Sequence, residues 1–424
     1  MARSLASLRV AGAAATAVAL AFGLAACSDN STETTATGNA ANSNLTGDPV
    51  NVGFIDTLSG TAFADPSQTL VVKMAVDEVN ATGGINGRPL NVVVCDTKGS
   101  ASNGLACARD MVENDKVVAL LGGNSSGGIA QVGQNAGVVN WGPMGDDPSD
   151  VANPESFIID TSAVGAGNAT YLGAKRFGAK SGAVIGMQGA DAFNQQAVDG
   201  FKKAGVDNVQ LIVAPPVADY TPYLQKVKDS GADVWTILPT SATIGPAISQ
   251  ATQLGITQPL VAFDNAMSNE ALEALSQATF PNSLALEKAV SDDVPVWQEY
   301  EGQLTKYAPG GKIDNPTDGS VTGNWINTWS FAQEARKISG AVTAASFRDH
   351  VNALTAFDSG VQPVMDFTKP GPVPGMPRHF NLWSYPGHAQ DGKTVLDDKT
   401  PVSWYEGTPV STWTPEQIKE ASGG

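Results

Sequence analysis

The sequence contains few of the residues that bind metals or carry out acid–base chemistry. Its 424 residues include three cysteines and three histidines. The histidines, His350, His379 and His388, all lie toward the end of the chain. There is no H-E-x-x-H metal helix, and no G-K-S/T follows the glycines at 122–128 as a phosphate loop would require. The cysteine spacing fits no zinc pattern. We therefore expect neither a bound metal nor a cofactor.

Positive charge is also scarce. The chain has 25 Lys and Arg against 42 Asp and Glu, a formal net charge of −17. Without a basic patch, such a surface disfavours nucleic acid and anionic lipid as partners. The length and the 42% hydrophobic content are sufficient for two domains, each with its own core.

Long apolar stretches are missing except at the N-terminus. Residues 10–26 are uncharged, rich in alanine, and too short and small-sided for a good membrane-spanning helix. They follow Arg3 and Arg9 and end in Leu24-Ala-Ala-Cys27, which resembles a bacterial lipobox. We predict a lipoprotein signal peptide at 1–26 and lipidation at Cys27. The alternative is an ordinary secretory cleavage site beside a chance cysteine.

Residues 27–48 are mostly Ser, Thr, Asn, Ala and Gly. A segment of this composition buries too little apolar surface to fold, so we expect a flexible tether. Behind a lipid anchor, such a tether would hold a domain near a membrane without inserting it. No later stretch is long and apolar enough to span.

The two remaining cysteines, Cys95 and Cys107, are predicted to form a disulfide, since exported proteins meet an oxidising environment. Cys95 ends a predicted strand and Cys107 lies on the next predicted helix. A bridge across this short loop adds about 3 kcal/mol in the chain-entropy model. Two free buried thiols are the alternative.

The rest of the chain is organised around residues 117–136. A short apolar run at 117–121 predicts a buried strand. Gly122 and Gly123 allow a sharp turn, Ser125 or Ser126 suits a helix N-cap, and 129–136 can continue as helix. Such a turn places amides and hydroxyls at the carboxyl end of a sheet, where an anion such as a carboxylate binds. An ordinary βα turn is the alternative.

Strands and helices alternate along most of the chain, which predicts parallel sheets covered by helices on both faces, twice over. Strands are predicted at 50–56, 90–94, 117–121, 137–141, 156–160, 182–187, 209–213, 233–238 and 260–263. Helices are predicted at 66–80, 102–114, 129–136, 165–177, 191–204, 220–230 and 244–254. After about residue 285 we expect helices at 294–307, 319–338 and 342–354, and then a hairpin involving 381–384 and Val395.

Several motifs resemble one known family. They are VNVGFIDTLSG at 50–60, AVDEVNATGGINGRPL at 75–90, ACARDMV at 106–112, GADVWT at 231–236 and SQATQLG at 249–255. In this order, together with the Gly/Ser turn at 122–128, they look like the substrate-binding proteins of branched-chain amino acid ABC importers. The similarity runs from about residue 49 to 355.

This resemblance implies an α/β fold of the type I periplasmic binding protein class, with two Rossmann-like lobes joined by three crossovers near residues 161, 285 and 355. Lobe I would comprise 49–161 and 286–355, and lobe II 162–285 and 356–424. It also implies a non-enzymatic, monomeric protein on the outer face of the bacterial cytoplasmic membrane. A small polar solute would bind between the lobes and pass to an ABC permease.

The resemblance also implies ligand contacts. Ser125 and Ser126 match the hydroxyl turn that holds a ligand carboxylate, Asp264 the acid that takes a ligand ammonium, and Phe193 a pocket aromatic. Structural alternatives are a core position for Phe193 and a turn position for Asp264.

The sequence departs from the family pattern at two pocket positions. Asp146 stands where the family has a carboxylate-binding threonine, and Thr240 or Ser241 where it has a second aromatic. An ionised aspartate cannot donate to a carboxylate. These departures argue against a plain leucine-like ligand, although Asp146 also suits an Asx-turn.

Two other functions fit part of the sequence. Residues 123–127, Gly-Asn-Ser-Ser-Gly, satisfy the G-x-S-x-G motif of serine hydrolases, and a Ser-Asp-His order is formally possible. A ligand-sensing receptor component with the same two lobes is the closer alternative. Neighbouring permease genes would favour transport, and a signalling partner would favour sensing.

Overall fold

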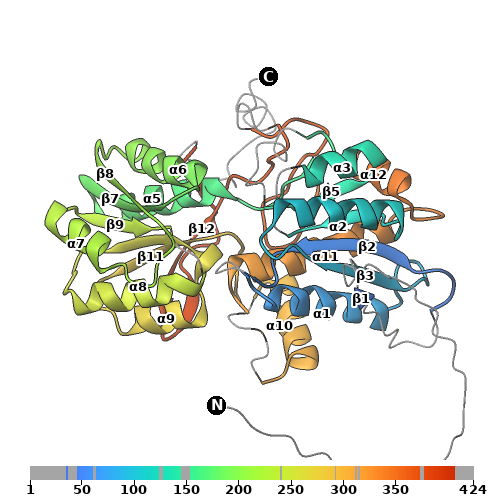
Figure 1. The fold of residues 1–424 in the computed structure, drawn as a ribbon, viewed down its shortest axis with the longest axis horizontal. Coiled ribbons are helices and arrows are strands. Elements are labelled where there is room, and N and C mark those ends of the chain that lie inside the picture. The colour runs from blue at the N-terminus through green and yellow to red at the C-terminus, as the bar shows by residue number, and fades with distance from the viewer. Residues whose placement is uncertain are drawn as a thin grey trace, which may run out of the picture. The chain divides into compact units, whose positions relative to one another are not determined.

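The computed structural model describes residues 35–36, 45–60, 64–123, 128–144, 153–238, 241–291, 293–310, 313, 316–372 and 377–405. The predicted signal peptide and Cys27 lie outside these residues. The described chain forms two sheets with helices packed on them (Figure 1).

The first sheet is parallel except for one short edge strand. Its order is β1 (Thr35–Ala36), β3 (Leu90–Asp96), β2 (Val50–Asp56), β4 (Ala119–Leu121), β5 (Val139–Trp141) and β6 (Ser156–Phe157). The middle strands are mostly apolar and buried because both faces are covered. Helices α1 (Ser67–Ala81) and α11 (Gly319–Arg336) cover one face, and α2 (Ala101–Glu113) and α3 (Ile129–Ala136) the other (Figure 1). Helices α10 (Pro295–Tyr307) and α12 (Ala344–Asn352) complete this part.

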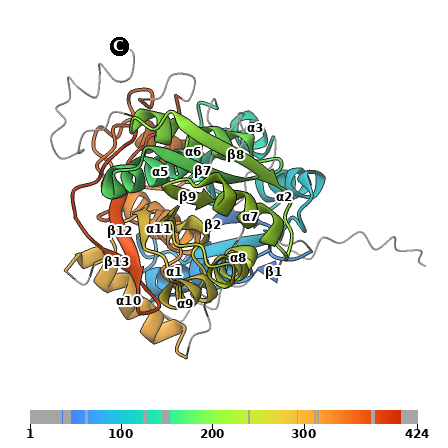
Figure 2. The ribbon, with the colours of Figure 1, turned by 90° about the vertical axis from the view of Figure 1, so that its left-hand side faces the viewer.

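The second sheet has five parallel strands and an antiparallel hairpin. Its order is β13 (Lys393–Leu396), β12 (Tyr385–Gln390), β11 (Asn282–Leu286), β10 (Leu260–Phe263), β9 (Val234–Ile237), β7 (Ser181–Met187) and β8 (Asn208–Ala214). Helices α5 (Ala163–Phe177) and α6 (Asp191–Lys203) pack on one face. Helices α7 (Thr221–Ser230), α8 (Ser241–Gln253) and α9 (Asn269–Ser276) pack on the other (Figure 2). A 3-10 turn, η1 (Asp264–Ala266), follows β10.

The predicted βα alternation is confirmed, and β2, α3 and β10 begin and end at the predicted residues. Four details differ. Helix α9 and strand β11 were not predicted, and the first strand of the hairpin begins at Tyr385. The N-cap of α3 is Gly128, not Ser125 or Ser126; its φ of 97° is a backbone conformation that glycine adopts readily.

The chain passes between the sheets three times. The first two passages follow β6 and β11. The third comes after Arg378–Phe380, where the amide of Ile158 donates to the carbonyl of Arg378 and the amide of Phe380 donates back to the carbonyl of Ile158. Before that passage, Phe357 and Phe367 pack edge-on against Trp141 of the first sheet. The chain therefore enters the second sheet later than the predicted crossover near residue 355.

Part of the predicted tether contacts the first sheet. Thr35–Ala36 pairs with β3, the amide of Thr46 donates to the carbonyl of Gly87, and the carbonyl of Asp48 accepts from Arg88.

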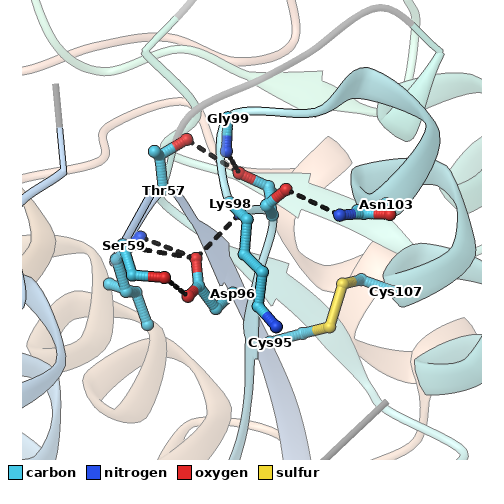
Figure 3. Close-up of a disulfide and its surroundings, with 10 residues drawn as sticks. Thr57, Ser59, Cys95, Asp96, Lys98, Gly99, Asn103 and Cys107 are labelled. Atoms are coloured by element: carbon cyan, nitrogen blue, oxygen red, sulfur yellow. Dashed lines mark hydrogen bonds between the residues drawn. A yellow bond between two sulfur atoms is a disulfide. The ribbon is translucent and has the colours of Figure 1, made fainter. Parts of the chain in front are cut away.

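The predicted disulfide is present. Cys95 of β3 and Cys107 of α2 are joined, with their Cα atoms 5.9 Å apart (Figure 3). Both side chains are 2% exposed and belong to the core under α2. The bridge therefore attaches α2 to the sheet from inside, beside the loop that begins at Asp96.

We expect the double substitution Cys95→Ser, Cys107→Ser to lower the free energy of unfolding by about 3 kcal/mol, because the unfolded chain regains the entropy of the open loop. Urea denaturation of both proteins measures this change. Reductant should lower the stability of the parent toward that of the double variant and leave the variant unchanged. Free thiols at both positions in folded, exported protein would contradict the pairing.

Candidate functional site

Four strands of the first sheet have their carboxyl ends at the same edge, so the four turns that follow them lie there together. Strands β2, β3, β4 and β5 are parallel and end at Asp56, Asp96, Leu121 and Trp141. Because parallel strands share one carboxyl edge, the segments that follow them meet there, and this edge is where open α/β sheets bind ligands.

The loop after β2 is held by one carboxylate. Asp96 accepts from the amides of Leu58 at 2.9 Å, Ser59 at 3.2 Å and Lys98 at 2.8 Å, and from the Ser59 hydroxyl at 2.5 Å (Figure 3). Burial raises the pKa of Asp96, but these hydrogen bonds outweigh it and hold the pKa below its ordinary value. Asp96 is therefore ionised when its carboxylate holds the loop.

The turn after β4 begins as predicted with two glycines. The amide of Gly122 donates to the carbonyl of Trp141 at 2.8 Å, and the amide of Gly123 donates to Asn324 Oδ1 at 3.1 Å. A cavity of about 10 Å³, lined in part by Gly122, Asn140 and Pro143, lies beside the turn. It has room for about one water molecule and not for a solute.

Two of the predicted ligand residues are described with their side chains. Phe193 lies on α6, half-buried, and its ring stacks on Phe263 with the centroids 6.1 Å apart. Asp264 is the first residue of η1, directly after Phe263. Helix α8 begins at Ser241, whose side chain lies outside the described part of the structure. The remaining predicted residues, Ser125, Ser126, Asp146 and Thr240, also lie outside it.

Asp264, which the sequence analysis assigned to a ligand ammonium, is buried. Its side chain is 2% exposed, and its carboxylate oxygens accept from the amide of Glu287 at 3.1 and 3.2 Å. Burial raises the pKa of Asp264 well above its ordinary value, and the neighbouring Glu287 adds to this effect while Lys288 opposes it. Asp264 is therefore part of a larger buried group of charges.

Lys288 lies at the centre of that group, which the sequence analysis did not identify. It is 1% exposed, and its ammonium donates to Asp160 at 3.0 Å, to Glu287 at 3.0 Å and to the carbonyl of Gly319 at 2.8 Å. An ammonium has three donors, so all are used. The charged pair Glu287-Lys288, directly after the apolar end of β11, was the available signal.

The partners of Lys288 come from distant parts of the chain. Asp160 follows β6, Glu287 and Lys288 follow β11, and Gly319 begins α11. His379, from the third passage, places its Nε2 at 2.9 Å from the carbonyl oxygen of Asp160. This buried cluster therefore joins all three passages between the sheets.

The cluster contains more negative than positive charge. Asp160, Asp264, Glu287 and Asp318 are buried around the single Lys288. Burial raises the pKa of Asp318 to about 7, although hydrogen bonds from Ser320 and Val321 oppose this. The positive end of the α11 dipole offsets part of the excess, since Asp318 caps this helix.

We expect Asp318→Asn to change how stability depends on pH. Because the pKa of Asp318 is raised from 3.8 to about 7, its contribution to stability is present below pH 4 and is lost as the pH rises to 7. Asparagine keeps the capping acceptor and has no charge to bury. The stability of the variant relative to the parent should therefore rise by up to about 4 kcal/mol from pH 4 to pH 8. Urea denaturation across this range measures it.

Asp264 and Tyr300 interact with Asp318 and are present in both proteins, so the difference reports residue 318 together with its coupling to them. Asp366→Asn is the control, because hydrogen bonds hold the pKa of Asp366 below its ordinary value despite partial burial. Its difference from the parent should be constant above pH 5. A constant difference for Asp318→Asn as well would show that this carboxyl titrates normally.

The described residues contain neither a metal-binding cluster nor a membrane-spanning helix. No group of three or more His, Cys, Asp or Glu in this part of the chain could hold a metal ion. None of the helices described is long and apolar enough to cross a membrane.

Comparison with known proteins gives similarities over most of the chain. An amino acid binding protein of Pseudomonas aeruginosa is 26% identical over 210 residues, which cover 46% of this chain and 55% of that protein. The chain thus spans about half the length of this relative.

Solved structures match over a larger share. The substrate binding protein of a branched-chain amino acid transporter from Streptococcus pneumoniae, in complex with isoleucine, has a TM-score of 0.65 and 18% identity, over 84% of this chain and 100% of that chain. A fatty acid ABC transporter substrate-binding protein from Thermomonospora curvata has a TM-score of 0.68 and 17% identity, over 85% and 94%. At these identities the likeness shows the fold, which is that of type I periplasmic binding proteins.

The family described as periplasmic binding protein matches residues 49–374. Its members are binding proteins and not enzymes, which removes the serine hydrolase interpretation of residues 123–127. Given a match over most of its length and the two-sheet fold, this chain belongs to the periplasmic binding protein family.

Proposed function

We propose that this protein is an extracytoplasmic solute-binding lipoprotein of an ABC importer. It binds a small polar solute, an amino acid or a related amide or carboxylate, between two lobes and delivers it to the permease. The observation that carries the proposal is the family match over residues 49–374 on a fold with two parallel sheets. The three passages between the sheets, after β6, after β11 and after Phe380, would act as the hinge, with the ligand favouring the closed state.

The solute class rests on the turns at the carboxyl edges of the sheets and on the relatives. The P. aeruginosa relative is an amino acid binding protein, and the S. pneumoniae structure holds isoleucine. The T. curvata protein belongs to a fatty acid transporter. Amino acids, isoleucine among them, and fatty acids all carry a carboxylate, the group that we assign to the hydroxyl turn with Ser125 and Ser126.

The opposite end of the solute faces the second sheet. We assign Phe193, Thr240 or Ser241, and Asp264 to this end, and Asp146 to the loop after β5. Asp264 is buried and its pKa is raised, so a bound ligand cation would stabilise its ionised form. The buried carboxyl groups around Lys288 favour a positive or amide-bearing group nearby, since charges attract strongly where water is excluded. This combination favours a zwitterion or an amide over a plain carboxylate.

A panel of amino acids, amides, urea-like compounds and small carboxylates should contain a ligand that raises the melting temperature. Saturation at about one hundred times Kd adds about 2.7 kcal/mol to stability. For that ligand, Ser125→Ala and Ser126→Ala should each weaken binding by roughly ten- to a hundredfold, and Asp264→Asn by a similar factor, because each removes an interaction with a charged group. Calorimetric titration measures the affinities.

Asparagine at 264 keeps an acceptor for the amide of Glu287, so the unliganded melting temperature serves as the control for folding. Unchanged affinity in both the double serine variant and Asp264→Asn would reject the proposed contacts. A loss of unliganded stability that accounts for the weaker binding would instead assign these residues to the fold.

The anchor has its own test. Cys27→Ser should abolish lipidation and release the protein from the membrane fraction. Its melting temperature should not change, because residue 27 begins the predicted tether. Fractionation and the mass of the N-terminal peptide measure the effect. If the variant stays with the membranes as the parent does, the lipobox assignment is wrong.

A further inference from the structure

Helix α11 carries two asparagines on a side that is covered by protein. Asn324 is 8% exposed and Asn327 is 1% exposed, three residues apart and therefore on one face. Burying a carboxamide is unfavourable unless its donors and acceptors find partners. The partners of these two side chains show what the face is used for.

Asn324 holds the turn after β4. Its Oδ1 accepts from the amide of Gly123 at 3.1 Å, and its Nδ2 donates to Gln68 Oε1 at 2.7 Å. Gln68 in turn donates to Asp65 Oδ2 at 2.8 Å and to Ser320 Oγ at 3.1 Å. This chain of amides fixes which way the carboxamide of Asn324 points, so that its oxygen faces the turn.

Asn327 holds the turn after β5. Its Nδ2 donates to the carbonyl of Gly142 at 2.8 Å, and its own carbonyl accepts from Trp141 Nε1 at 3.1 Å. The two asparagines therefore bind neighbouring strand ends from one helix.

The glycines at these turns fit the asparagines closely. A Cβ at Gly122 would lie 2.2 Å from Asn324 Oδ1, and one at Gly142 would lie 2.0 Å from Asn327 Oδ1. Both glycines also have positive φ, 51° and 67°, which other residues rarely adopt. At each turn, only glycine leaves room for the asparagine side chain and adopts the backbone conformation easily.

We propose that Asn324 and Asn327 are positioning residues for solute binding, which set the backbone of the two turns that begin at Gly122 and at Gly142. The inference rests on the proposed function, in which these turns contact the solute. Helix α11, which has no residue assigned to the ligand, would then determine the geometry of the edge that binds it.

The first test needs no ligand. Amide hydrogen exchange, followed by mass spectrometry, should be about tenfold faster in peptides covering Gly122 and Gly123 for Asn324→Ala, and in peptides covering Gly142 for Asn327→Ala. Thr328→Val is the matched control: this residue is fully buried on α11, and its hydroxyl bonds only within the helix, to the carbonyl of Asn324. The control should leave both turns protected.

If Asn324→Ala unfolds, Asn324→Asp replaces it, since aspartate keeps the acceptor for Gly123 and loses the donor to Gln68. This variant should fold and keep the turn protected. Exchange at the turns that matches the Thr328→Val control in both alanine variants would overturn the proposal. Faster amide exchange spread evenly over the whole first sheet would also overturn it.

The second test uses isoleucine as the probe. If the parent binds isoleucine, both alanine variants should bind it about tenfold more weakly, while their unliganded melting temperatures match that of Thr328→Val. Weaker binding that only follows lower melting temperatures would show a structural role and overturn the proposal. If the parent binds neither isoleucine nor any other panel member, the proposed function fails, and the exchange experiment still decides whether the asparagines hold the turns.

Discussion

The described structure depends most on the hydrogen bonds and ion pairs of the buried Lys288 ammonium. A lysine that is 1% exposed must satisfy all three of its donors inside the protein, and here they go to Asp160, Glu287 and the carbonyl of Gly319. Asp160 is more than a hundred residues from Lys288 in the sequence, and Gly319 is 31 residues from it. Removing one partner of such a pair costs about 3–5 kcal/mol, because the other charge remains buried. The passages between the sheets must therefore assemble together around this ammonium.

Helix α11 extends the effect of this cluster into the first sheet. Its N-terminal carbonyl, at Gly319, binds Lys288, and its side carries Asn324 and Asn327, which bind the glycine turns after β4 and β5. It also packs along α1, whose Gln68 completes the amide network. Helix α11 thus contacts both the buried Lys288 cluster between the sheets and the two turns that are candidates for ligand binding.

The sequence was sufficient to predict most of the fold, because βα periodicity and glycine turns are local signals. The disulfide was also predictable, since only two cysteines remain after the lipobox. The hairpin start and α9 were missed because their patterns are short. The buried cluster could not be predicted, because nothing local to Lys288 indicates that Asp160 will lie beside it. Two asparagines in a helix usually indicate a solvent face, and only the tertiary structure reverses that interpretation. For Ser125 and Ser126, which lie outside the described residues, the sequence prediction still stands alone.

The central claim of this account is that the chain is a binding protein whose lobes close on a small solute about the three passages joined by Lys288. Small-angle X-ray scattering of the exported protein, with and without the solute that stabilises it most in the thermal screen, tests this claim directly. The account predicts a smaller radius of gyration with solute, and no such change for a panel compound that leaves the melting temperature unaltered. Tight binding with an unchanged scattering profile would contradict closure and, with it, the proposed role of the crossovers as a hinge.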